Sequence, residues 1–119
     1  MDEHKKIIGV IGSGAMGAGI AQVAAAAGHR VIIYDSSSKA LDKAQGALSK
    51  TLEKLISRGK IEESDAKSIF ARIVFSEDII SFKNCTFIIE AIVENLETKQ
   101  NMFQHVEALV GDDCILASN

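Results

Sequence analysis

Three glycines near the amino terminus have the spacing G-x-G-x-x-G, at Gly12, Gly14 and Gly17. Such a loop can bind the pyrophosphate of a dinucleotide, because backbone N–H groups at a helix amino terminus are directed at the phosphates. The first glycine permits a tight turn, the second lets the backbone approach the phosphates, and the third allows the helix to pack closely on a sheet. The residues that we assign to cofactor binding are therefore Gly12, Ser13, Gly14, Ala15, Met16 and Gly17.

An aspartate extends this pattern. Asp35 lies 18 residues after Gly17 and ends an apolar run, close to the spacing of about 20 residues expected for the acid that binds the cofactor ribose. Its carboxylate can accept hydrogen bonds from the ribose hydroxyls of NAD, whereas it would repel the 2′-phosphate of NADP. Serines occupy residues 36–38, where an NADP site would favour arginine. The sequence predicts NAD; the alternative is a helix-packing glycine cluster with Asp35 on the surface.

The elements that must position these residues alternate between strands and helices. Short apolar runs predict strands at 6–11, 31–34, 73–75, 86–90 and 114–117. Helical patterns cover 15–27, 41–55, 62–70 and 96–110, with a short helical turn at 77–82. This alternation predicts an α/β fold, a Rossmann-type doubly wound parallel sheet, truncated after about five strands. The connection between the second and third strands holds two helices instead of one.

Composition narrows the possible functions. The chain has 119 residues, 47% hydrophobic and 24% charged, which fits one globular domain over residues 1–119. The net charge of −3 offers no basic field for nucleic acid. No apolar stretch approaches the roughly 18 residues of a membrane span, and acidic residues at the amino terminus argue against a signal peptide.

The two cysteines, Cys85 and Cys114, lack metal or redox spacing. We therefore expect both to be buried and inert, and the protein to be cytoplasmic.

Three segments resemble the 3-hydroxyacyl-CoA dehydrogenase family: GSGAMGAGIA at 12–21, EAIVENL at 90–96 and ILASN at 115–119. The resemblance covers the entire chain, and the two-helix connection also fits it. It implies oxidation of (S)-3-hydroxyacyl-CoA to 3-ketoacyl-CoA with hydride transfer to NAD, in fatty acid β-oxidation or butyrate metabolism. Glu94 and Lys99 match family positions that contact NAD. The alternatives are the NAD-binding half of a β-hydroxyacid dehydrogenase and a non-enzymatic NAD-binding module.

The resemblance also implies contacts with the acyl-CoA substrate. The family places a hydroxyl and a basic residue seven positions apart on the helix after the ribose-binding acid, which corresponds to Thr51 and Arg58. Seven residues are nearly two helical turns, so both side chains share one face. Lys54 lies on the same side and could bind CoA phosphates. The alternative is an ordinary solvated helix face.

The catalytic serine, histidine, glutamate and asparagine of the family correspond to positions beyond Asn119, as does its C-terminal helical substrate and dimerisation domain. The three histidines present, His4, His29 and His105, do not match the catalytic base. We therefore expect the chain to bind NAD without turnover. The run at 114–117 would become an exposed apolar edge, and such edges recruit further chains. This edge leads us to expect a homo-oligomer.

Overall fold

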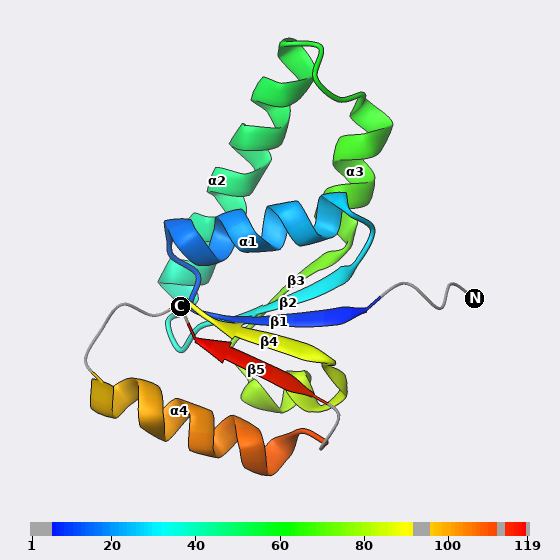
Figure 1. Cartoon of the computed structure of the whole chain (residues 1–119). Coiled ribbons are helices and arrows are strands. Elements are labelled where there is room, and N and C mark those ends of the chain that lie inside the picture. Colours follow the sequence, from blue (N-terminus) through cyan, green and yellow to red (C-terminus); the bar gives the residue numbers. More distant parts are fainter. Residues whose placement is uncertain (1–5, 92–95, 112–113, 119) are drawn as a thin grey trace.

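The computed structural model describes residues 6–91, 96–111 and 114–118. Its centre is a sheet of five parallel strands in the order β3-β2-β1-β4-β5 (Figure 1). The strands are β1 (Ile7–Ile11), β2 (Arg30–Tyr34), β3 (Ile73–Ser76), β4 (Phe87–Glu90) and β5 (Ile115–Ser118). The predicted Rossmann-type sheet is therefore confirmed. All five predicted strands are present, with their ends displaced by at most one residue.

Helices cover both faces of the sheet (Figure 1). One face packs against α1 (Ala15–Ala26), α2 (Ser38–Ser57) and α3 (Glu63–Ala71), and the other against α4 (Leu96–Leu109) and the 3₁₀ helix η1 (Ile79–Asn84). The predicted two-helix connection between β2 and β3 is confirmed as α2 and α3. These two helices form a hairpin that extends well beyond the sheet. The short helical turn expected at 77–82 lies two residues later, as η1.

Two apolar clusters hold the layers together. The first joins β1 and β2 to α1 and the hairpin, and includes Val10, Val31, Ala21 and Leu48. The second lies on the opposite face and includes Ile11, Phe82, Ile88 and Val106, all of them fully buried. Because neighbouring side chains of a strand point to opposite faces, Val10 and Ile11 each belong to a different cluster. The continuous apolar runs in the sequence reflect this burial of both faces.

Local signals set the helix ends. The hydroxyl of Ser37 accepts a hydrogen bond from the backbone N–H of Ala40 at 3.1 Å and so caps the start of α2. One of the three serines at 36–38 therefore has the capping role that such residues favour. Two glycines, Gly28 and Gly59, follow α1 and α2 with φ values of +100° and +71°. These left-handed conformations end a helix at little cost for glycine.

One expectation about the cysteines is wrong in part. Cys85 is buried as expected, whereas Cys114 is only half-buried. The reason is its position just before β5, which lies at the edge of the sheet and exposes 58% of the neighbouring Ile115. Among the helices described, none is long and apolar enough to cross a membrane.

Candidate functional site

The glycine loop joins β1 to α1 at the carboxyl edge of the sheet. Gly12 adopts a φ of +103°, a left-handed conformation that an L side chain would strain, so the expected tight turn is present. Its N–H donates a 2.8 Å hydrogen bond to the carbonyl of Tyr34, the last residue of β2. The loop is thereby tied to the strand that leads into Asp35.

The other two glycines differ in what surrounds them. A Cβ atom on Gly17 would overlap the carbonyl oxygen of Gly12 and lie 3.3 Å from the Cγ1 of Val10. Gly17 therefore permits the close approach of α1 to the end of β1. A Cβ atom on Gly14 would meet no described atom within 4 Å. The backbone at Gly14 consequently faces open space that a phosphate can enter.

The side chain of Asp35 accepts hydrogen bonds directly from this loop. Its Oδ2 accepts two hydrogen bonds from Ser13, one from the hydroxyl at 2.8 Å and one from the backbone N–H at 3.1 Å. Its Oδ1 accepts a 3.0 Å hydrogen bond from the N–H of Ser37. Ser13 itself is only 5% exposed. The structure thus places the predicted acid next to the predicted loop.

The arrangement fits a dinucleotide. Within the described residues, no side chain caps the amino end of α1 at Gly14, and no acidic residue lies in its first turn. A helix amino terminus of this kind carries a partial positive charge and directs N–H groups outward, which suits a pyrophosphate. In parallel α/β sheets, ligands bind at the carboxyl ends of the strands, where this loop and Asp35 lie.

A buried acid at the carboxyl edge of the sheet was not predicted from the sequence. Glu90 ends β4, pairs in register with Ile11 of β1, and is fully buried. The sequence does show an acid at the end of an apolar strand, but the same pattern also describes an exposed strand end. Its burial follows only from the neighbouring strands β1 and β5, both of which pair with it.

The residues assigned to the substrate lie apart from the glycine loop. Thr51, Lys54 and Arg58 are exposed on α2, and Arg58 is the residue that ends the helix. The hydroxyl of Thr51 donates a 3.0 Å hydrogen bond to the carbonyl of Ala47. At 1.5 Å per residue, Thr51 lies about 20 Å along the helix from its start near Asp35. These residues form no common cluster with the loop.

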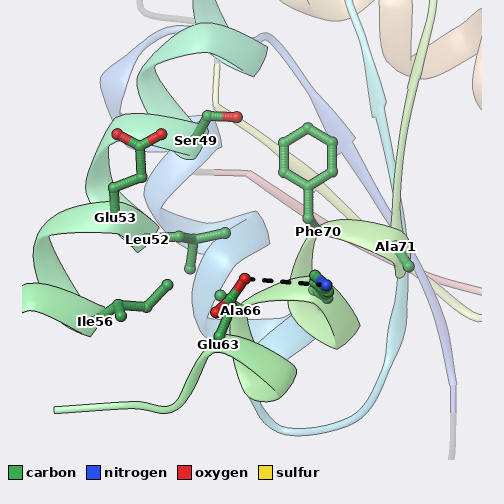
Figure 2. A pocket seen from close by; sticks show the side chains of 9 residues that line it. Ser49, Leu52, Glu53, Ile56, Glu63, Ala66, Phe70 and Ala71 are labelled. Atoms are coloured by element: carbon green, nitrogen blue, oxygen red, sulfur yellow. Dashed lines mark ion pairs between the residues drawn. The ribbon is translucent and has the colours of Figure 1, made fainter. Parts of the chain in front are cut away.

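A groove of about 420 Å³ runs between α2 and α3 (Figure 2). Its lining includes Leu52 and Ile56 from α2 and Ala66 and Phe70 from α3. None of the three predicted CoA residues lines it, because they occupy another side of α2. The groove is therefore a feature separate from the predicted substrate face.

The structure does not describe the side chains of two predicted NAD contacts. Glu94 lies outside the described residues, and Lys99 belongs to α4 without a described side chain.

Among the described residues, no group of three or more histidine, cysteine or acidic side chains could hold a metal ion. Neither cysteine is an activated nucleophile: burial and, secondarily, Cys114 raise the pKa of the Cys85 thiol to about 12. Burial also raises the pKa of Cys114.

The sheet order, the loop and the acid together define a class of protein, the Rossmann-type NAD-binding domains. Residues 7–119 match the family described as 3-hydroxyacyl-CoA dehydrogenase, NAD binding domain, and the chain belongs to this family. The prediction of this family, of NAD as cofactor and of the fold is confirmed. The match also favours this family over the β-hydroxyacid dehydrogenases.

Known relatives agree with this assignment. The chain is 41% identical over 111 residues to a probable 3-hydroxybutyryl-CoA dehydrogenase from Deinococcus radiodurans, covering 93% of this chain and 40% of that protein. It is 43% identical over 110 residues to the fatty acid oxidation complex subunit alpha of Psychrobacter cryohalolentis, covering 92% of this chain and 15% of that protein. The structure of (S)-3-hydroxybutyryl-CoA dehydrogenase from Ralstonia eutropha matches with a TM-score of 0.92 and 35% identity, over 96% of this chain and 40% of that one. The chain thus spans two fifths or less of these relatives.

Proposed function

We propose that this chain supplies the NAD site of an enzyme that oxidises (S)-3-hydroxyacyl-CoA to 3-ketoacyl-CoA. The observation that carries the proposal is the hydrogen-bonded pair of glycine loop and Asp35, in a chain that belongs to this family. When bound, NAD supplies the hydride acceptor. The loop from Gly12 to Gly17 holds the pyrophosphate, and Asp35 holds the adenosine ribose. Glu94 and Lys99 are proposed as further NAD contacts.

By itself the chain is proposed to bind NAD without turnover. Oxidation of a secondary alcohol needs a base within hydrogen-bond reach of the hydroxyl proton. Among the described residues, His29 lies at the opposite edge of the sheet, before β2, where its Nδ1 accepts a 3.1 Å hydrogen bond from the N–H of Lys6. His105 is exposed on α4. Neither imidazole lies beside the glycine loop.

Binding and turnover can be measured separately. Calorimetric titration with NADH should show saturable binding to one site per chain. Incubation with NAD and 3-hydroxybutyryl-CoA should then produce no steady accumulation of NADH. Failure to bind NADH would contradict the cofactor site, and steady production of NADH would contradict binding without turnover.

The acyl-CoA substrate is proposed to contact the exposed side of α2. Lys54 and Arg58 present positive charge there, and Thr51 lies one turn before Lys54. A CoA molecule is long enough to connect a distant helix face to a reaction centre near the cofactor. Titration of the NADH-saturated chain with coenzyme A should show weaker binding for Arg58→Ala. Lys67→Ala, at the groove on α3, is the matched control. An equal loss of coenzyme A affinity in the control would contradict binding at this side of α2.

The chain is further proposed to form a homo-oligomer in the cytoplasm. The edge strand β5, with Ile115 exposed, is the proposed contact of a homo-oligomer. The proposed location is the cytoplasm, although one relative, from Arabidopsis thaliana, is named as peroxisomal. Light scattering at high concentration tests the assembly. A monomer under these conditions would contradict it.

A further inference from the structure

The carboxylate of Asp35 already has three donors from the protein. The hydroxyl and the N–H of Ser13 both reach Oδ2, at 2.8 and 3.1 Å, and the N–H of Ser37 reaches Oδ1 at 3.0 Å. A carboxylate has about four lone-pair sites, two on each oxygen. Ser13 therefore occupies both sites of Oδ2, and the described residues leave one site on Oδ1.

The hydroxyl of Ser13 is well placed to restrain the acid. Ser13 is 5% exposed, so water does not readily replace its hydrogen bond. A hydrogen bond from a hydroxyl to an ionised carboxylate is stronger than one between neutral groups. Rotation of the Asp35 side chain would break this bond and leave the buried hydroxyl without its acceptor. The carboxylate is thus held in one orientation before any ligand binds.

We propose that Ser13 is a positioning residue that sets the preference for NAD over NADP by holding Asp35 in place. Its hydroxyl directs Oδ1 to the ribose and keeps the negative charge where a 2′-phosphate would have to lie. A carboxylate that is free to rotate could turn away from the phosphate and reduce the repulsion between like charges. This inference rests on the proposed function, in which Asp35 binds the adenosine ribose.

Ser13 differs from the rest of the glycine loop in how it would act on the cofactor. Its neighbours in the loop act through backbone atoms, which NAD and NADP would contact alike. The side chain of Ser13 acts only through Asp35, where the two cofactors differ. Loss of the hydroxyl should therefore change the ratio of the two affinities, whereas a merely structural defect would weaken both in parallel.

The test is the ratio of the Kd for NADPH to the Kd for NADH, measured by calorimetry and by displacement of NADH. Ser13→Ala removes the hydroxyl and keeps the backbone N–H bond, and should lower this ratio about tenfold, the factor expected from a hydrogen bond to a charged group. Ser68→Ala, an exposed serine on α3, is the control and should leave the ratio unchanged. Circular dichroism should show the same helical content in all variants.

A second background tests whether Ser13 acts through Asp35. In Asp35→Asn the charge is absent, so adding Ser13→Ala should change the ratio by less than about twofold. An unchanged ratio in Ser13→Ala, or an equal change in the Asp35→Asn background, would overturn the proposed role of Ser13 while NADH binding still stands. Failure of the unaltered chain to bind NADH would overturn both the role and the proposed function.

Discussion

Gly17 and Gly12 approach so closely that a single added methyl group cannot be accommodated between them. A Cβ atom on Gly17 would overlap the carbonyl oxygen of Gly12 and lie 3.0 Å from its carbonyl carbon. The obstacle is backbone, which cannot rotate away as a side chain can. The third glycine of the loop therefore sets the distance between α1 and the end of β1, and with it the position of the helix terminus that we propose faces the cofactor.

Gly17→Ala should lower the free energy of unfolding by about 3 kcal/mol and abolish NADH binding, because α1 must move away from β1. Gly19→Ala is the matched control in the same helix, since a Cβ there meets no described atom within 4 Å. The control should raise the free energy of unfolding by about 0.5–1 kcal/mol, from helix propensity alone. Urea denaturation measures both. Equal effects of the two variants would contradict the role of close packing.

Asp35→Asn should raise the affinity for NADPH relative to NADH by at least about tenfold. Two like charges about 4 Å apart repel by roughly 4 kcal/mol at an effective dielectric constant near 20, and the variant removes this repulsion. Asp42→Asn makes the same change in net charge at an exposed position on α2. Competition between the two cofactors measures the ratio. A similar shift in Asp42→Asn would show that the overall charge, not Asp35, decides the preference.

The buried thiol of Cys85 should make the chain sensitive to alkaline pH. Burial raises its pKa from 9.0 in the unfolded chain to about 12 in the folded chain. A raised pKa contributes stability that is fully present below the unfolded value and is lost as pH rises from about 9 to 12. The free energy of unfolding of the unaltered chain should therefore fall more steeply over this range than that of Cys85→Ala. Urea denaturation at pH 8 and pH 10 measures the free energy of unfolding of both proteins. An equal change between these two pH values in both proteins would contradict this role of Cys85.

Arg72→Ala should lower the free energy of unfolding by about 1 kcal/mol. The guanidinium of Arg72 donates a 2.8 Å hydrogen bond from Nη1 to the carbonyl of Ala25 in the last turn of α1, a turn without a basic residue of its own. Lys67→Ala is the control, because its pair with Glu63 at 4.0 Å is exposed and should contribute less than about 0.5 kcal/mol. Thermal unfolding measures both variants. A loss in Lys67→Ala as large as that in Arg72→Ala would contradict the capping role.

Much of the fold and part of the site could be predicted because their signals are local. Apolar runs predicted the strands to within one residue, and the spacing of Gly12, Gly14 and Gly17 predicted the loop that the structure shows at the end of β1. Cys114 was misjudged because its exposure depends on which strand lies at the edge of the sheet. The CoA residues stay a prediction, since an exposed helix face carries no local sign of its partner.

By itself, the sequence determined the order of the elements, the glycine loop, the acid at Asp35 and the family to which the chain belongs. Only the tertiary structure decided that the hydroxyl of Ser13 donates a hydrogen bond to Asp35, that Arg72 caps α1 through Ala25, and that Glu90 is buried. The two hydrogen bonds join residues 22 and 47 positions apart. Periodicity and spacing report on neighbours within a few turns of the chain, whereas such contacts depend on strand order and helix packing, which exist only once the sheet has formed.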